Sequence, residues 1–197
     1  MNVLVRIKGN FDSFVSDETG EEGEPQPEAC RQSLFKDAPQ PDCQDAATPP
    51  AEASVQTESE QTEVVSAGIY FERGGSRYVY YEEVDEQDQD IVKNLLIVTK
   101  KGDITLRKRG LIDTEMRFVP GSEQMSNYMT PYGGAVMGVF TNSARAQVFE
   151  TGSTAEDGAE QPVMTVDLDY IIYMDYKMLS QCRVQISVLP TEEAKQD

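Results

Sequence analysis

Residues 166–178, VDLDYIIYMDYKM, show the clearest structural pattern in the sequence. Apolar and polar side chains alternate along it, with Val166, Leu168 and Tyr170 on one side and Asp167 on the other. Successive side chains of a β-strand point to opposite faces of a sheet, so this alternation predicts a long, curved antiparallel strand with one face in the core and one in water. We expect the apolar face to continue through Ile172, Met174, Tyr176 and Met178.

The same alternation recurs along most of the chain. Residues 62–83 predict a hairpin that turns at Gly74–Gly75, residues 94–110 a second hairpin that turns near Gly102, and residues 182–188 the partner of the long strand. Helical periodicity is not evident. We therefore predict an all-β protein, an antiparallel meander of about 8–10 strands that closes into a barrel, because closure removes the exposed strand edges that invite aggregation. A β-sandwich is the alternative.

Residues 16–61 differ in composition from the rest of the single domain that we assign to residues 1–197. Six of the ten prolines lie there, and Phe35 is the only aromatic residue. Such a chain cannot bury enough apolar surface to fold, so we predict a disordered acidic insertion, and a disordered tail over residues 190–197. The insertion is either a solvated spacer or a segment that recruits a basic protein partner.

The charge and the missing residue types exclude several functions. Lys and Arg number 17 against 35 Asp and Glu, a net charge of -18, which opposes binding to nucleic acid or to an anionic membrane. The chain has no histidine, so the commonest general base and metal ligand are missing. No phosphate-binding or dinucleotide motif is present. We assign no cofactor, no metal and no catalytic residue, although an enzyme based on a carboxylate or a tyrosine stays an alternative.

The cysteines and the N-terminal sequence indicate a location. The three cysteines do not form a disulfide pattern and are interpreted as reduced thiols. The first ten residues alternate apolar and charged side chains, unlike a signal peptide, and no apolar run is long enough to span a membrane. We therefore expect a cytoplasmic protein.

Five segments together suggest a family. The order RYVYYEE, GDITLRKRG, EMRFVPG, YMTPYG and DLDYIIYMDYKM resembles the YwiB-like family of bacterial proteins, which are small calycin-like (lipocalin-like) β-barrels. The resemblance covers the N-terminal strand and residues 63–188, and it implies this barrel fold without implying an activity. Lys108, two residues before Gly110, departs from the arginine that is usual there. The most specific matches are Met116, Phe118 and Gly121, then Tyr128, Thr130, Pro131 and Gly133, and finally Tyr170.

Tyrosines and methionines on the inward strand faces suggest a binding site. We predict that a small amphipathic ligand lies in the barrel lumen, with hydroxyl groups at its polar end. A solidly filled core made of the same side chains is the alternative. The candidate ligand-binding residues are Tyr80, Glu82, Lys108, Arg109, Met116, Phe118, Tyr128, Thr130 and Tyr170.

Residue chemistry and strand geometry give an interpretation of three further segments. Arg107 and Arg109 share a strand face opposite Lys108, and they form either an anion site or a charge ladder with nearby carboxylates. Glu82 and Glu83 are adjacent on a strand, so only one of them can face the interior. The stretch NYMTPYGG, residues 127–134, is interpreted as a corner of the barrel, because its proline cannot donate to a central ladder.

Overall fold

The computed structural model describes residues 1–16, 55–84, 91–149 and 161–191. Met1–Phe14 and Thr57–Asp197 form one compact unit, and Val15–Gln56 forms a second unit of which only the two ends are described. The described residues form ten strands and no helix. The strands are β1 (Asn2–Ser16), β2 (Val55–Arg73), β3 (Ser76–Val84), β4 (Ile91–Val98), β5 (Ile104–Arg109), β6 (Asp113–Phe118), β7 (Ser122–Thr130), β8 (Gly133–Val148), β9 (Met164–Met174) and β10 (Lys177–Pro190).

The ten strands form one antiparallel sheet that closes on itself. From β2 to β10 each strand neighbours the next in the chain, and β1 closes the barrel between β10 and β2. Val3 pairs with Pro190 on the β10 side, and on the β2 side the backbone N–H of Tyr70 donates to the carbonyl of Met1 at 2.9 Å. The prediction of a closed antiparallel barrel is confirmed, with a strand count at the upper end of the expected range.

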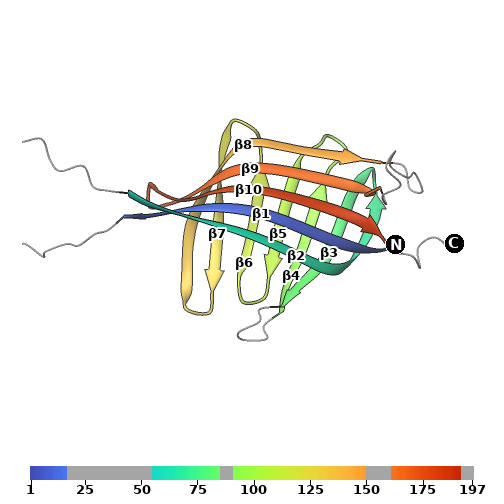
Figure 1. Ribbon diagram of the computed structural model, residues 1–197, viewed down its shortest axis with the longest axis horizontal. Coiled ribbons are helices and arrows are strands. Elements are labelled where there is room, and N and C mark those ends of the chain that lie inside the picture. Colours follow the sequence, from blue (N-terminus) through green and yellow to red (C-terminus); the bar gives the residue numbers. More distant parts are fainter. Residues whose placement is uncertain (17–54, 85–90, 150–160, 192–197) are drawn as a thin grey trace, which may run out of the picture. The chain divides into compact units, whose positions relative to one another are not determined.

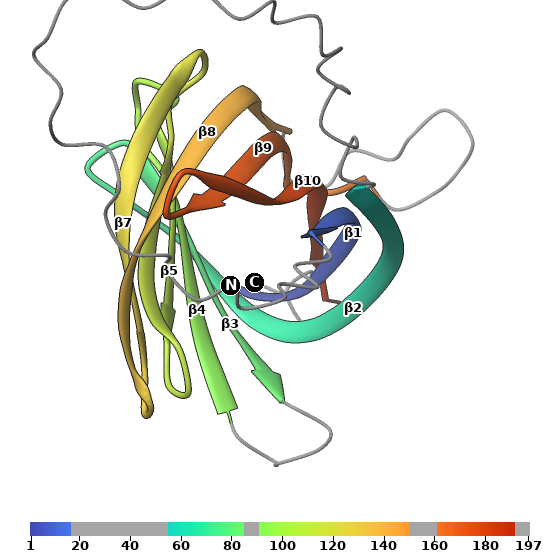
Figure 2. The same ribbon diagram turned by 90° about the vertical axis from the view of Figure 1, so that its left-hand side faces the viewer.

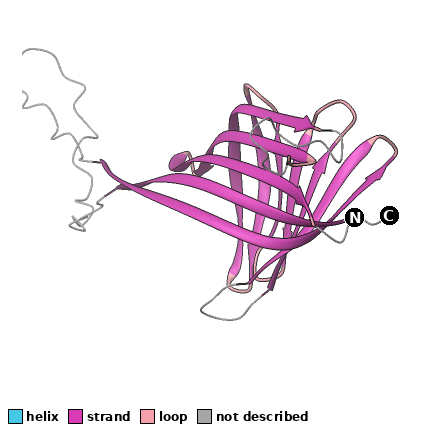
Figure 3. Ribbon diagram, turned by 45° about the vertical axis from the view of Figure 1, so that its right-hand side comes forward, coloured by secondary structure: helices cyan, strands magenta, loops and turns pink. Residues whose placement is uncertain are grey.

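The barrel consists of two groups of strands that cross steeply. Strands β3 to β7 run across the direction of β1, β2, β9 and β10 (Figure 1), and Figure 2 shows β1 and β2 curving around one side. The two longest strands, β2 and β8, join the groups at the corners (Figure 3). Each of these strands has a feature that allows it to bend. Strand β8 has a register shift between Thr141 and Ser143. Strand β2 has Gly68, where the backbone lies so close to β3 that an added Cβ atom would be 2.7 Å from the carbonyl oxygen of Tyr80.

Side chains from both groups meet in the barrel centre. Val5 of β1, Val79 of β3 and Val139 of β8 are completely buried. The rings of Phe118 on β6 and Tyr170 on β9 are 5.0 Å apart and tilted by 60°, a favourable aromatic contact. At this level the barrel interior is packed with side chains.

The strand expected over residues 166–178 is shorter than its alternation predicts. Strand β9 ends at Met174, and Asp175 and Tyr176 have φ angles of 50° and 63°, which form a tight hairpin turn into β10. Tyr176 is fully exposed (103%) and Met178 is exposed too, so the expectation that they extend the apolar face is wrong. The turn contains neither glycine nor asparagine, and the alternation continues through it, so the sequence pattern did not indicate a turn at this point.

The predicted disordered segments overlap with strands at their edges. Strand β2 begins at Val55, so residues 55–61 belong to the sheet, and Ser59 donates a 2.6 Å hydrogen bond to Asp12 on β1. Residues 17–54 lie outside the described residues. At the other end, Pro190 closes β10 and the hydroxyl of Thr191 donates to the carbonyl of Asn2 at 3.2 Å, whereas residues 192–197 are not described.

Candidate ligand-binding site

A row of polar side chains crosses five neighbouring strands on the inward side of the sheet. Tyr81 on β3 is paired with Asn94 on β4, which is paired with Lys108 on β5. Lys108 is paired with Thr114 on β6, and Thr114 with Tyr128 on β7. Directly opposed residues have Cβ atoms about 5 Å apart, so these side chains are mutual neighbours. We call these five residues the polar row.

Asn94 has an unfilled hydrogen-bonding position. Its side chain is completely buried (0% exposed), and its Nδ2 donates to the carbonyl of Val92 at 3.2 Å. Its Oδ1 accepts no hydrogen bond from any residue that the structure describes. A buried acceptor without a partner costs about 1–3 kcal/mol, so a side chain of this kind calls for a functional explanation.

Lys108 brings a positive charge to the same row. Its Nζ lies 3.3 Å from a carboxylate oxygen of Glu83, which faces inward two residues after Tyr81. The two side chains are only 27% and 26% exposed. Lys108 is the residue paired with Asn94, so the row carries both a partly buried ammonium group and a buried side-chain carbonyl, and together they could bind a group that combines an anion with a hydrogen-bond donor.

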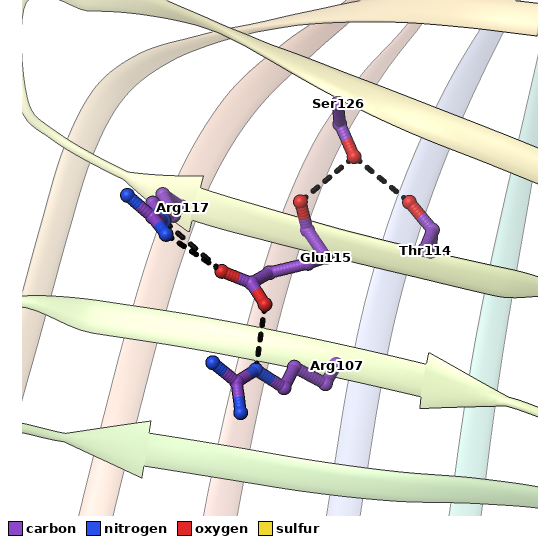
Figure 4. Close-up of polar contacts among 5 residues, drawn as sticks. All are labelled: Arg107, Thr114, Glu115, Arg117 and Ser126. Atoms are coloured by element: carbon purple, nitrogen blue, oxygen red, sulfur yellow. Dashed lines mark hydrogen bonds and ion pairs between the residues drawn. The ribbon is translucent and has the colours of Figure 1, made fainter.

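Beside the polar row, strands β6 and β7 are held together partly by hydrogen bonds of side chains. Strands β6 and β7 share only the pairs Asp113–Met129 and Thr114–Tyr128, and they diverge from Thr114 toward Arg117 (Figure 4). At the divergence the buried hydroxyls of Thr114 and Ser126 are 2.9 Å apart, and Ser126 donates to the carbonyl of Glu115 at 2.7 Å. Side-chain hydroxyls thus replace part of the backbone ladder at this seam.

Two buried tyrosines lie at the centre of the barrel. Burial, and to a lesser extent the charge of Glu83, raises the pKa of Tyr81 far above its ordinary value. Burial also raises the pKa of Tyr170, with a further contribution from the neighbouring thiol of Cys182. Burial likewise raises the pKa of Cys182, so this thiol is not an activated nucleophile. Both phenols stay protonated at neutral pH and can donate hydrogen bonds.

The structure separates the predicted ligand-binding residues into two groups and a turn. Those on the inward side are Lys108, Met116, Phe118, Tyr128 and Tyr170; those on the outward side are Tyr80, Glu82 and Arg109; and Thr130 ends β7 at the hairpin turn into β8. Met116, Phe118 and Tyr170 are buried in the core, and Tyr128 packs against it.

The predicted residues on the outward side, and Thr130 at the turn, do not contribute to the polar row. The Tyr80 hydroxyl donates to Glu82 on the outer surface, and this bond raises the pKa of Tyr80. Arg109 is exposed opposite Lys93. The hydroxyl of Thr130 donates to the carbonyl of Gly133 at 3.0 Å, so the chain does reverse here, in the hairpin turn between β7 and β8 rather than at a corner of the barrel.

Sequence reasoning missed four inward residues of the site: Tyr81, Glu83, Asn94 and Thr114. Tyr80 was expected on the inward side, but it shares a face with Tyr78, which stacks on Phe71 at 5.0 Å on the outward side. Counting from the apolar Val79 would have placed Tyr81 and Glu83 inward. Asn94 shares the face of Leu96, and a polar residue in that phase was the available signal.

The basic segment forms a charge ladder on the outer surface. Glu115 accepts a hydrogen bond from Arg107 at 2.7 Å and another from Arg117 at 2.9 Å (Figure 4). The bonds to Arg117 and then to Arg107 hold the pKa of Glu115 below its usual range. For Arg107 the ladder interpretation is confirmed.

The part of the chain that the structure describes offers no cluster of histidine, cysteine, aspartate or glutamate side chains that could hold a metal ion. Within the same residues, no helix is long and apolar enough to cross a membrane.

The fold and its inward polar row define a closed, ten-stranded antiparallel β-barrel of the YwiB-like type. A family model described as "Domain of unknown function (DUF1934)" matches residues 51–186, and the chain belongs to this family. The crystal structure of the ywiB protein from Bacillus subtilis is similar, with a TM-score of 0.54 and 12% identity over 96% of this chain and 93% of that one. This similarity shows the fold. No curated protein matches the sequence.

Proposed function

We propose that this protein is a binding protein rather than an enzyme, and that it holds a small, partly apolar ligand at the polar row of its barrel. The observation that carries the proposal is the buried Oδ1 of Asn94, which has no hydrogen-bond partner among the described residues. A protein that keeps such an atom beside an ammonium group loses stability without a ligand and recovers it with one.

The row suggests the chemistry of the ligand. Asn94 requires an N–H or O–H donor, and Lys108 favours a carboxylate or another anion that competes with Glu83. Tyr128 is half-buried and packs against the core, and it supplies an apolar surface with a polar tip. We therefore propose a small amphipathic acid that also carries a hydrogen-bond donor.

The test uses protein purified under native conditions from its own host. Native mass spectrometry should find a bound small molecule, and the apolar anionic dye anilinonaphthalene sulfonate should bind saturably to ligand-free protein. Lys108→Met and Asn94→Leu should each weaken the dye at least tenfold. Arg109→Met is the matched control, since it removes the same charge one residue away on the opposite face, and it should leave binding unchanged. Absence of a bound molecule together with equal dye binding by all variants would refute the proposal.

Recruitment of a basic protein is the second candidate function. Residues 17–54 contain ten acidic and two basic side chains, a charge that favours a basic partner. Deletion of residues 17–54 keeps both β1 and β2, so it removes the acidic segment without removing a strand. Identical sets of captured proteins with and without the deletion would remove this candidate.

We propose a cytoplasmic location for the protein. Its support is Cys182, a buried free thiol that is compatible with a reducing compartment. Fractionation of the host that recovers the protein outside the cytoplasm would contradict this proposal.

A further inference from the structure

A groove of about 540 Å³ lies on the outer face of β7, β8 and β9. It is distinct from the polar row, because its β7 residues, Glu123 and Met125, alternate with the inward Ser126. Its volume is within the range of small-molecule sites, about 300–1,000 Å³. The side chains and backbone that line it belong to Glu123, Met125, Val136, Gly138, Phe140, Tyr173, Asp175 and Tyr176.

Apolar side chains gather in this groove although it faces solvent. Met125 is 68% exposed and Val136 is 53% exposed, and Phe140 and Tyr173 are half-buried beside them. The solvent side of an antiparallel sheet is usually polar, and a contiguous exposed apolar surface often marks a binding site. The apolar lining therefore suits the hydrocarbon part of a ligand.

The charged groups of the groove have one sign. Its two charged side chains, Glu123 and Asp175, are both carboxylates. Glu123 forms no ion pair with any residue in the described ranges. A site with apolar walls and carboxylates of one sign favours a cation.

Gly138 sets the position of the Glu123 carboxylate. A Cβ atom added at Gly138 would collide with Oε1 of Glu123 and would lie 3.5 Å from Cβ of Tyr173. The missing side chain therefore lets the carboxylate lie over the sheet, on the floor of the groove and next to the Tyr173 side chain. A carboxylate beside an aromatic ring is a suitable environment for an organic ammonium group, which both groups attract.

We propose that this groove binds a small organic cation with an apolar body. The ammonium group lies between the Glu123 carboxylate and the Tyr173 ring, and the hydrocarbon part contacts Met125, Val136 and Phe140. The binding depends on the charge of Glu123 and on the position that Gly138 allows it. It does not involve the polar row, so it is independent of the function proposed above.

The test titrates the full-length, isotope-labelled protein with benzyltrimethylammonium and follows the amide resonances of Gly138 and Tyr173. Saturable shifts confined to the groove are expected, with much weaker effects from neutral benzyl alcohol and from anionic phenylacetate. Glu123→Gln should weaken the cation at least tenfold. Gly138→Ala should also weaken it, because the new methyl group displaces the carboxylate.

Two control variants make the result specific. Glu60→Gln removes one exposed negative charge on β2, outside the groove, and Lys108→Met alters the polar row. Neither variant should change the binding of benzyltrimethylammonium in the groove. Glu123 is exposed, so its variant should fold, which circular dichroism checks. The proposal is overturned if the cation does not bind saturably up to about 10 mM, if benzyl alcohol binds as well, or if Glu123→Gln binds the cation as the wild type does.

Discussion

Replacing Asn94 by leucine should make the protein more stable. Leucine has a similar volume, and it removes the buried Oδ1, which has no partner in the described ranges of the chain, a gain of about 1–3 kcal/mol. The substitution loses the 3.2 Å bond from Nδ2 to Val92, which costs about 1 kcal/mol. A buried leucine also gains from the hydrophobic effect next to Leu96. We expect the free energy of unfolding to rise by about 1–2 kcal/mol.

Urea unfolding followed by circular dichroism, together with a thermal scan, measures this change. For a protein of this size the expected gain raises Tm by about 2–8 °C. Asn127→Leu is the matched control, because it makes the same substitution on the exposed outward side of β7, where a change within about 0.5 kcal/mol is expected.

The reasoning fails if Asn94→Leu destabilises the protein by 1 kcal/mol or more, about the value of one hydrogen bond, while Asn127→Leu is neutral. Asn94 would then stabilise the fold by contacts other than the one to Val92, and its Oδ1 would not be an open position for a ligand. A variant that is more stable and no longer binds dye would instead show that this residue exchanges stability for binding.

Three further perturbations follow from the structure. First, the raised pKa values of Tyr81 and Tyr170 mean that the folded chain keeps protons that the unfolded chain releases above pH of about 10. The free energy of unfolding should therefore fall as the pH rises past that value, and it should fall less steeply in Tyr170→Phe. Urea unfolding measured from neutral to alkaline pH tests this, and an equally steep fall in the wild type and the variant would contradict it. Second, the lowered pKa of Glu115 gives stability that is present above the ordinary glutamate pKa of about 4.3 and is lost as the pH falls through the lowered value. The difference in the free energy of unfolding between the wild type and Glu115→Gln should therefore vanish in acid. A difference that persists in acid would rule out an ionic origin. Third, Gly68→Ala should destabilise by about 1–3 kcal/mol, since its Cβ would lie 2.7 Å from the Tyr80 carbonyl and 2.9 Å from Val5 Cγ2; an unchanged urea midpoint would show that the corner can adjust.

Most of the fold was predictable because it depends on alternation. Val3 and Val5, and again Val166 and Leu168, place their strands by period alone, and Gly74–Gly75 marks a turn by its chemistry. The turn at Asp175–Tyr176 was not predictable, because side chains rarely adopt its left-handed conformation and alternation continues through it. The start of β2 was missed because residues 56–61 are all polar and show no alternation, although β2 lies beside β1 in the barrel.

The candidate site was predicted less well than the fold. Lys108 and Tyr128 were identified from their residue types, and the structure brings them into one row. Asn94 became a candidate only when its burial and its missing partner were known, and both depend on side chains that are distant in the chain. Periodicity tells which side of a strand a residue faces, but it does not tell which polar atom lacks a partner.

The pairing of β1 with β10 has a consequence for folding. Val3 pairs with Pro190, so the first strand of the barrel must wait for the last strand before the barrel can close. Until then β1 and β2 leave an open edge, which is the part of a nascent barrel most exposed to wrong partners. Closure that joins such distant segments is intrinsically slow, so we expect refolding in milliseconds to seconds in stopped-flow experiments.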